Sequence, residues 1–419
     1  MGAPPPAQDR PARVRWAVFA LACAVSWLLY LHRYSWGVIK PAFRRDYPDI
    51  TDTQLGWLDS AFNATYAIGQ VPGGLAGDYF GPRGVLTVII LLWSAAVAGV
   101  GWTGGFARLL GVRAAFGLAQ AGAYPVLNKV TRNWFPLAVR TSIQGVVAAL
   151  GRIGAACAPV VVATLLMGVF ALPWRTSLLV IAAPGVVLAA AFWLVVRNSP
   201  PEQPWSKPAE QADANRGTLL LNRSSLGNLG VLLLYAFAST FQDQLYVNWI
   251  PLFLTAGRGL DDSEMGLFTS LPLLGGAVGG VLGGFLNDWL LHKTGNRRWT
   301  RSGIAFTGKF VAAGLIVASL QMADGRLAMV VLLAARVFGD WSLPTQWGTI
   351  TDVGGRASGT VFGLVNAAGA VGGFVAGPVL GALKQHYGWE GLFLGAAGMC
   401  LVSAFSWLAI DCTRRLVAD

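Results

Sequence analysis

Long apolar stretches, separated by short polar turns, run through almost the whole chain. About twelve of them approach the ~20 residues that an α-helix needs to cross the hydrocarbon core of a bilayer. We expect spanning helices at residues 16–38, 54–76, 84–105, 107–128, 141–168, 175–197, 227–255, 265–290, 302–322, 326–348, 358–382 and 390–411. Since backbone polar groups in lipid must be satisfied within the protein, this pattern predicts an all-α membrane protein.

One polar segment is much longer than the other turns. Residues from Arg197 to Arg223 are rich in proline, asparagine and charges, and they divide the apolar stretches into two sets of six. We therefore predict two six-helix bundles joined by a linker. The expected parts are a tail at 1–15, a bundle at 16–197, a linker at 198–226, a bundle at 227–411 and a tail at 412–419.

The composition supports the membrane assignment. The chain is 54% hydrophobic and 12% charged, with a mean hydropathy of +0.54, whereas soluble domains carry about 25% charged residues. The net charge of +11 would suggest a nucleic-acid partner in a soluble protein, but here the basic residues cluster in turns between apolar stretches. The positive-inside rule then places both termini and the linker in the cytoplasm. We expect no nucleic acid, and a multi-pass protein of a bacterial cytoplasmic (inner) membrane, in contact with the lipid bilayer.

The sequence offers no sign of enzyme chemistry. Its four cysteines lack the spacing of metal ligands, and no nucleophile–base pair or nucleotide-binding loop is evident. We therefore expect neither a metal nor a cofactor, and no enzyme activity. Transport driven by ATP is excluded on the same ground, which leaves secondary transport.

The two halves of the chain repeat a turn pattern. Residues 74–78 (Gly-Leu-Ala-Gly-Asp) follow the second apolar stretch, and residues 284–288 (Gly-Phe-Leu-Asn-Asp) follow the eighth. A repeat at half-chain spacing is typical of transporters built from two bundles around a site at the bilayer midplane. The residues that we expect to form the conformational loops are Gly74, Asp78, Gly81, Arg83 and Asp288.

The pattern Gly-x-x-x-Asp-x-x-Gly-x-Arg at 74–83 resembles the cytoplasmic loop of the major facilitator superfamily. Within it, the chain resembles the anion:cation symporter family. The matching motifs are Tyr30-x-x-Arg33, Ser60-Ala61-Phe62 to Tyr66, Gln70 to Gly74, Arg113 to Pro125, Trp134-Phe135-Pro136 to Arg140, Trp249-Ile250-Pro251 and Gly363 to Pro378. The resemblance implies two pseudo-symmetric six-helix bundles and symport of sugar acids, such as hexuronates and aldonates, or other organic anions by alternating access. It also implies a monomer with H⁺ as coupling ion; Na⁺ is an alternative.

The resemblance also implies roles for particular residues. The arginine that matches Arg33 holds the substrate's carboxylate, a task that suits the planar guanidinium fork. Tyr30, Tyr66 and Asn366 would line the same site. A gate bridge between Arg33 and Asp243 remains an alternative, and both roles are compatible if the substrate competes for the bridge.

Two positions depart from the family pattern. His32 occupies a position that is commonly acidic, and Gln120 replaces a glutamate that is thought to carry the coupled proton. Because glutamine does not titrate, coupling through the usual residue is in doubt. The remaining candidates for proton coupling are His32, Asp243 and Asp340; His32 could equally be an interfacial residue.

Ionisable residues inside apolar stretches are functional candidates, since each costs at least ~2.5–3.5 kcal/mol at the membrane centre. Arg336 and Asp340 are four residues apart, which suits a structural pair or a titratable carboxylate held by its own arginine. Arg152 is either a second anion-binding cation or a partner of Asp243 or Asp340. The expected coupling or gating residues are His32, Arg113, Arg152, Asp243, Arg336 and Asp340.

Two polar helix faces complete the predicted site. Arg113, Gln120 and Tyr124 form one stripe at helical spacing, and the segment 242–249 carries amide and aromatic side chains that suit sugar hydroxyls. Gln346 and Trp347 are weaker additions. The expected substrate-binding residues are Tyr30, Arg33, Tyr66, Gln120, Tyr124, Gln242, Tyr246, Trp249 and Asn366.

Three functions follow from these observations. The first is a secondary transporter of a small organic anion. The second is an organophosphate or sugar-phosphate exchanger of the same fold, which would need two cations in the cavity and so depends on Arg113 and Arg152. The third is a transporter-like sensor, which the short tail after Asp411 disfavours.

Overall fold

The computed structural model describes residues 10–135, 137–198, 223–354 and 358–414. These parts of the chain form α-helices and three π-helical segments, and they contain no β-strand. Every apolar stretch that we expected to span the membrane coincides with one or more of these helices. The prediction of an all-α membrane fold is therefore confirmed. The predicted linker falls largely on residues 199–222, which lie outside the described residues.

The first half of the chain forms a lobe of seven α-helices and one π-helical segment in its described parts. Its elements are α1 (Arg10–Asp46), α2 (Asp52–Phe80), α3 (Pro82–Trp102), α4 (Phe106–Ala121), α5 (Ala123–Trp134), α6 (Leu137–Pro159), η1 (Val160–Val169) and α7 (Trp174–Val195). The expected helix 107–128 is interrupted at Gly122, so α4 and α5 share it. Helix α1 continues well past the predicted end at residue 38, to Asp46.

The second half forms a second lobe. Its elements are α8 (Arg223–Gln244), η2 (Leu245–Trp249), α9 (Ile250–Leu252), η3 (Phe253–Gly257), α10 (Asp262–Thr294), α11 (Arg297–Leu320), α12 (Gly325–Gly339), α13 (Ser342–Gly354) and α14 (Ser358–Ala409). Helix α14 changes direction at Gly388, where φ is +66°. It therefore contains both of the last two predicted spans.

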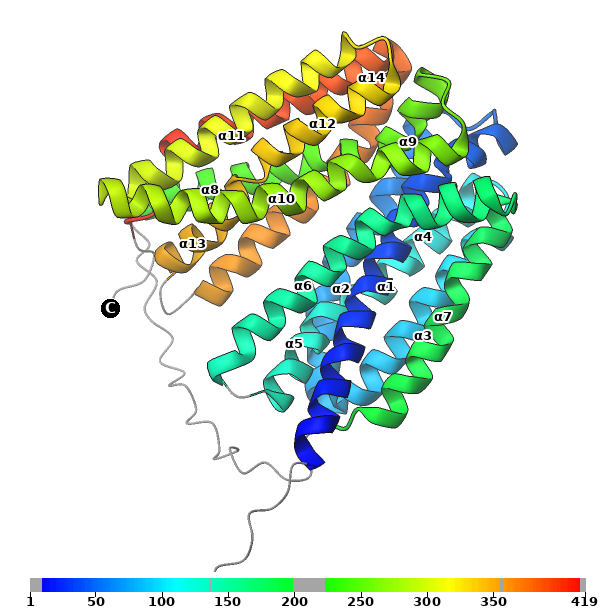
Figure 1. The fold of residues 1–419 in the computed structure, drawn as a ribbon, viewed down its shortest axis with the longest axis horizontal. Helices are drawn as coiled ribbons and strands as arrows, with labels where there is room; N and C mark the ends of the chain where they lie inside the picture. The colour runs from blue at the N-terminus through cyan, green and yellow to red at the C-terminus, as the bar shows by residue number, and fades with distance from the viewer. Residues whose placement is uncertain (1–9, 136, 199–222, 355–357, 415–419) are drawn as a thin grey trace, which may run out of the picture.

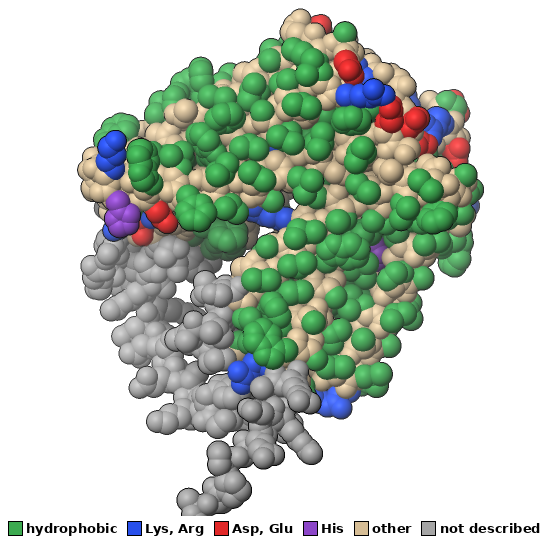
Figure 2. Space-filling view, in the orientation of Figure 1, with side chains coloured by type: hydrophobic (Ala, Val, Ile, Leu, Met, Phe, Trp, Pro, Cys, Tyr) green, Lys and Arg blue, Asp and Glu red, His purple; other side chains and the backbone are tan. Residues whose placement is uncertain are grey.

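Eight helices in the described residues are long and apolar enough to cross a membrane. Large hydrophobic side chains such as Leu92, Val187 and Phe285 are exposed on their outer faces. Figure 2 shows hydrophobic side chains spread over both lobes, with charged side chains gathered near the ends of the helices. An apolar surface of this extent would be unfavourable in water, and it identifies the lipid-facing side of the protein.

The two lobes meet at one end of the molecule and diverge toward the other (Figure 1). The polar contacts that join them in the described residues concentrate at the end opposite to the start of α1, which we call the closed end. Two of these contacts are exposed or partly exposed ion pairs, Arg45 with Asp262 and Lys384 with Asp52, each at 2.7 Å. At the same end, the Thr164 hydroxyl donates to the Ser263 carbonyl oxygen at 2.7 Å.

Glycines bring the backbones of the lobes into contact at the closed end. Gly56 in α2 faces Gly377 in α14, and a Cβ on either residue would collide with the carbonyl oxygen of the other. Next to this contact, the Asn63 amide donates to the Gly373 carbonyl oxygen at 3.2 Å, and the Ser60 hydroxyl donates to the Phe374 carbonyl oxygen. Close approach through small residues is how helices associate within membranes, where no hydrophobic force drives them together.

Candidate substrate and coupling site

Arg33 lies in the middle of α1, inside a cage of aromatic rings from α1 and α2. Its guanidinium carbon is 4.4 Å from the ring centre of Tyr66, 5.0 Å from Tyr30 and 5.2 Å from Phe62. The rings of Phe62 and Tyr66 stack at 5.6 Å, because residues four apart share one face of a helix. Cation–π contacts with these rings stabilise the positive charge of the guanidinium where water has little access to it.

No carboxylate in the described parts of the chain neutralises the charge of Arg33. Its Nε donates to Oε1 of Gln120 at 3.1 Å, which is a neutral acceptor. In the described residues Arg33 has no ion pair, and its Nη2 atom is buried without a hydrogen-bond partner. A buried donor without a partner costs about 1–3 kcal/mol. One guanidinium nitrogen of Arg33 therefore has a donor to spare within the cage.

Gln120 and Tyr124 fix the wall of this cage. The Gln120 Nε2 donates to the Leu29 carbonyl oxygen at 3.0 Å, which turns the amide oxygen toward Arg33. The Tyr124 hydroxyl is 2.8 Å from that of Ser26, and its ring lies 6.1 Å from that of Tyr30. The fold thus brings together Tyr30, Arg33, Tyr66, Gln120 and Tyr124, which are the first-lobe members of the predicted site.

A buried ion pair lies closer to the closed end, and the sequence analysis missed it. Lys40 Nζ is 2.9 Å from Asp59, and both side chains are at most 1% exposed. Trp36 Nε1 donates to the same carboxylate at 2.7 Å, and the Lys40 ammonium lies 4.6 Å from the ring of Trp249 in the second lobe. Lys40 lies two residues beyond the expected span 16–38, and Asp59 lies within the expected span 54–76. The signal available in the sequence was one charge inside an apolar stretch and one just after the preceding stretch.

Arg113 belongs to this deeper cluster rather than to the cage. Its Nε donates to the Leu58 carbonyl oxygen at 3.1 Å, and its guanidinium carbon lies 5.1 Å from the ring of Trp36 and 5.2 Å from that of Phe62. The stripe predicted on this helix therefore serves two places: Gln120 and Tyr124 at the cage, and Arg113 beside Asp59.

The second lobe carries its own charged cluster around Arg336. This guanidinium makes an ion pair with Asp243 from α8 and a second with Asp340, whose Oδ2 is 3.3 Å from its Nε. Its carbon also lies 5.0 Å from the ring of Tyr246. The proposed bridge between Arg33 and Asp243 is not present in this structure, because Arg336 holds Asp243 instead.

Lys309 is a third charged residue, after Lys40 and Asp59, that the sequence analysis did not single out. It is buried in α11, and its Nζ donates to the Ser239 hydroxyl at 3.0 Å and to Oε1 of Gln242 at 3.5 Å. The second lobe thus sets two cations, Lys309 and Arg336, against the two carboxylates of Asp243 and Asp340. Its embedded charges are balanced, whereas those of the cage are not.

The helix that carries the polar segment 242–249 is irregular. It passes through the π-helical segments η2 and η3 on either side of Pro251, which lacks a backbone donor. Such segments are frequent at functional sites. The Tyr246 hydroxyl and Trp249 Nε1 are both buried without a hydrogen-bond partner, and Trp249 packs on Lys40.

Three predicted residues lie apart from the cage contacts. His32 is buried against α7, where its Nε2 is 2.7 Å from the Ile181 carbonyl oxygen. Asn366 is exposed on α14. Arg152, on α6, is partly exposed and has no hydrogen bond or ion pair within the described residues. The roles assigned to these residues stay predictions.

The first conformational loop is held within its own lobe. Gly81 has φ of +84°, and Arg83 donates through Nε to the Trp193 carbonyl oxygen at 2.8 Å. The guanidinium of Arg83 also stacks 4.0 Å from the ring of Trp193. A Cβ on Gly74 would lie 3.4 Å from Pro125. The side chain of Asp78 lies outside the described residues.

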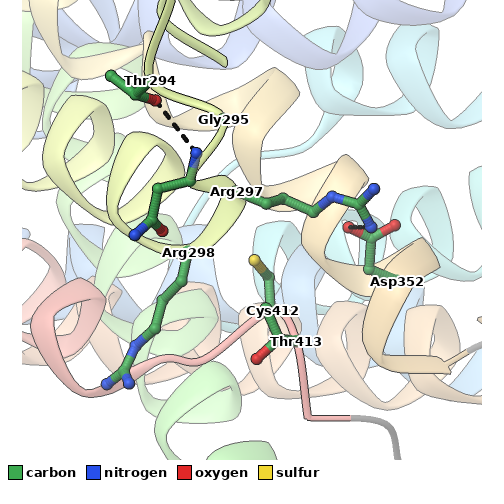
Figure 3. A pocket seen from close by; sticks show the side chains of 8 residues that line it. Thr294, Gly295, Arg297, Arg298, Asp352, Cys412 and Thr413 are labelled. Carbon is green, nitrogen blue, oxygen red and sulfur yellow. Dashed lines mark hydrogen bonds and ion pairs between the residues drawn. The ribbon is translucent and has the colours of Figure 1, made fainter. Parts of the chain in front are cut away.

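The second loop leaves Asp288 exposed, with an amide donor from Asn287 at 3.4 Å. A hollow of about 650 Å³ lies nearby, between the end of α10, the start of α11, α13 and the residues after α14. Figure 3 shows Arg297 turned toward Asp352 across it, at 3.6 Å. Arg298 pairs with Asp411 at 3.3 Å. These arginines are engaged by carboxylates, so the hollow is a structural junction of helix ends.

Comparison with known proteins identifies the fold. The sequence profile of the Major Facilitator Superfamily matches residues 18–377. The chain belongs to this superfamily. This major facilitator chain is 28% identical over 409 residues to the probable sulfoacetate transporter of Cupriavidus necator, covering 95% of this chain and 94% of the relative. It is 27% identical over 391 residues to the hexuronate transporter of Bacillus subtilis, covering 90% of each.

Solved structures support the same fold. A bacterial homologue of the human lysosomal transporter Spinster, in an inward-facing and unoccupied conformation, superposes on this major facilitator chain with a TM-score of 0.80. The sequence identity is 18%, and the match covers 96% of this chain and 98% of the other. The protein is therefore an integral, multi-pass membrane transporter and not an enzyme. The predicted fold of two pseudo-symmetric six-helix bundles is confirmed.

Proposed function

We propose that this transporter carries a small organic anion, a sugar acid or related carboxylate, and that Arg33 binds its acid group. The observation that supports this most directly is the Arg33 guanidinium, buried among aromatic rings with one nitrogen unpartnered and no carboxylate beside it. A carboxylate could accept two parallel hydrogen bonds from such a fork. The tyrosines and Gln120 around it offer further polar contacts for hydroxyl groups.

The named relatives support the same class of substrate. In addition to the sulfoacetate and hexuronate transporters, a D-galactonate transporter of Escherichia coli O6:H1 is 25% identical over 427 residues and is covered over 96% of its length. The substrates for which these relatives are named are small organic anions. The cage around Arg33 gives a physical reason why this chain would share that preference.

Alternating access is the proposed mechanism. The lobes are joined at the closed end by the Gly56–Gly377 contact and by ion pairs that can open in water, since exposed pairs contribute ~0–1 kcal/mol each. The basic turns place both termini in the cytoplasm of a bacterial cell by the positive-inside rule. The closed end, which is opposite to the start of α1, would then face the periplasm. Substrate at Arg33 would then exchange with the cytoplasm in this conformation. The protein would act as a monomer.

The coupling ion is proposed to be H⁺, with Na⁺ as the alternative. Because Gln120 replaces a titratable residue, a coupled proton would have to use another group. The candidates are His32 against α7, and Asp243 and Asp340, which share Arg336. Asp243 and Asp340 suit the task better. When one of these two carboxylates is protonated, the other still neutralises the charge of Arg336.

The test is uptake into liposomes that contain the purified protein, with and without an inward proton gradient. The labelled panel comprises hexuronates, aldonates, aromatic carboxylates and sugar phosphates. We expect a carboxylate to be transported, and Arg33→Gln and Arg33→Lys to abolish its uptake while the protein still inserts. Arg108→Gln, at an exposed arginine of α4, is the matched control and should transport normally.

Near-normal uptake by either Arg33 variant would remove Arg33 from the binding site and overturn the proposal. Uptake of a sugar phosphate alone would favour the exchanger. Accumulation only with the proton gradient identifies a symporter, and transport that ignores the gradient identifies a facilitator, an exchanger or a sodium-coupled carrier.

A further inference from the structure

Arg152 lies next to the wall of the Arg33 cage and reaches toward the other lobe. The preceding residue, Gly151, packs against that wall: a Cβ there would lie 2.8 Å from the Tyr30 ring and 2.9 Å from the Tyr124 hydroxyl. Arg152 itself turns away to α10, where its Nη1 is 3.1 Å from the position of a Cβ on Gly280. The guanidinium therefore lies between the two lobes, against Gly280 of α10.

Glycines on one face of α10 leave room for the Arg152 side chain. Gly280 has only the Arg152 guanidinium within 4 Å of its Cβ position. One turn earlier, a Cβ on Gly276 would lie 2.5 Å from Oδ2 of Asp340 and 3.1 Å from Nε of Arg336. This glycine face of α10 thus borders both Arg152 and the charged cluster of the second lobe.

Arg152 resembles Arg33 in having no ion pair in the described residues. The positive charge of Arg152 acts on Asp340, but that carboxylate is already held by Arg336. The other embedded cations are engaged: Lys40 by Asp59, Lys309 by Ser239 and Gln242, Arg113 by Leu58, and Arg336 by Asp243 and Asp340.

The embedded charges are unequal in number. Among the charged side chains discussed above that lie away from the closed end and the terminal loops, six cations (Arg33, Lys40, Arg113, Arg152, Lys309 and Arg336) stand against three carboxylates (Asp59, Asp243 and Asp340). The excess of three positive charges is unfavourable in a membrane unless a ligand compensates for it. A ligand with one negative charge would leave Arg33 or Arg152 without an anion.

We propose that the substrate is a dianion with an acid group at each end, one bound by Arg33 and the other by Arg152. This inference rests on the proposed function and narrows its substrate class to aldarates, dicarboxylates or sulfonated carboxylates. A guanidinium fork serves both carboxylate and sulfonate, because each presents a pair of acceptor oxygens. A phosphate ester is distinct from these, because it carries both charges on one group.

The test compares the binding of paired probes to the full-length protein in lipid nanodiscs by calorimetry. D-Glucarate and D-gluconate differ in the second carboxylate, and sulfoacetate and glycolate differ in the sulfonate; glucose 6-phosphate has both charges on one group. In at least one pair we expect the dianion to bind about ten-fold more tightly than the monoanion, the scale of one charge-assisted hydrogen bond. Arg152→Gln should reduce that ratio to near one, because it weakens binding of the dianion more than binding of the monoanion.

Arg152→Lys tests the geometry of the second site, and should restore part of the preference because it keeps the charge without the fork. Equal affinity for both members of each pair, or an equal loss for both in Arg152→Gln, would overturn the dianion proposal and leave Arg33 in place. Tight binding of glucose 6-phosphate alone would also overturn it. Binding of none of the five probes, or binding that Arg33→Gln does not change, would instead contradict the proposed function itself.

Discussion

Arg33 Nε donates to Oε1 of Gln120 at 3.1 Å, so a neutral amide positions the guanidinium at the centre of the cage. The other end of that amide is fixed by the Leu29 carbonyl oxygen at 3.0 Å. A carboxylate in the same place would position Arg33 equally well, but it would also neutralise it. The glutamine therefore keeps the arginine oriented and leaves its charge available to a ligand.

Replacing Gln120 with glutamate should make substrate binding dependent on pH. When ionised, the new carboxylate would pair with Arg33 and compete with the substrate; when protonated, it would resemble the amide. We expect the KM of Gln120→Glu to exceed that of the wild type by roughly ten-fold or more at high pH, on the scale of one charge-assisted hydrogen bond, and to approach it as the pH falls. The measurement is KM for uptake as a function of pH in liposomes with equal pH on both sides.

Gln120→Leu is the control for that experiment, since it removes the hydrogen bond without adding charge, and its KM should not follow pH more steeply than that of the wild type. A Gln120→Glu variant whose KM follows the same pH profile as the wild type would show that position 120 does not compete for Arg33.

The Lys40–Asp59 ion pair should contribute to stability as a unit, so that losing one partner destabilises the fold more than losing both. Removing one partner leaves a buried, uncompensated charge, which typically costs about 3–5 kcal/mol. We expect Lys40→Met and Asp59→Leu each to lower the melting temperature strongly, and the double variant to recover much of the loss. Thermal unfolding of the purified protein in detergent measures this, and a double variant as unstable as the sum of the single variants would contradict it.

The Gly56–Gly377 contact should control the closed end. A Cβ at either position would collide with a carbonyl oxygen across the lobes, so Gly56→Ala and Gly377→Ala should disfavour this conformation. Cysteines placed at Thr53 and Gln385, whose side chains hydrogen-bond at 2.8 Å, report the closed state by disulfide cross-linking in an otherwise cysteine-free background. We expect the cross-linking yield to fall several-fold in Gly56→Ala and in Gly377→Ala.

Gly314→Ala is the matched control, because no atom lies within 4 Å of its Cβ position. Its cross-linking yield should equal that of the parent. An unchanged yield in both Gly56→Ala and Gly377→Ala would show that the lobes can close without this glycine contact.

Loss of Arg336 should be more harmful than loss of either acid that it binds. Arg336→Gln leaves Asp243 and Asp340 close together without their cation, whereas Asp340→Asn leaves the ion pair with Asp243 intact. We therefore expect Arg336→Gln to have the lower melting temperature. A smaller loss in Arg336→Gln than in Asp340→Asn would indicate that the cluster is not held together by this arginine.

The sequence predicted the cage more completely than the charge clusters. Tyr30, Arg33, Tyr66 and Gln120 could be placed in one site because they fall within motifs of a family that the chain resembles. Asp59 and Lys309 were missed because an average over an apolar stretch hides one charge, and Lys40 was missed because α1 continues past its expected end at residue 38. Whether such a charge is a turn residue or a buried partner depends on the neighbouring helix, which the stretch itself does not reveal.

The sequence alone determined that the protein is a bundle of membrane helices in two related halves, because the length and polarity of each stretch are local properties that the bilayer selects directly. Only the tertiary structure decided which charges meet. The rotation of each helix and the glycine contacts between helices placed Asp243 on Arg336 rather than on Arg33, and Lys40 on Asp59. Those pairings leave Arg33 without a counter-charge among the residues that the structure describes, because an ion pair forms only where packing brings two side chains within a few ångströms.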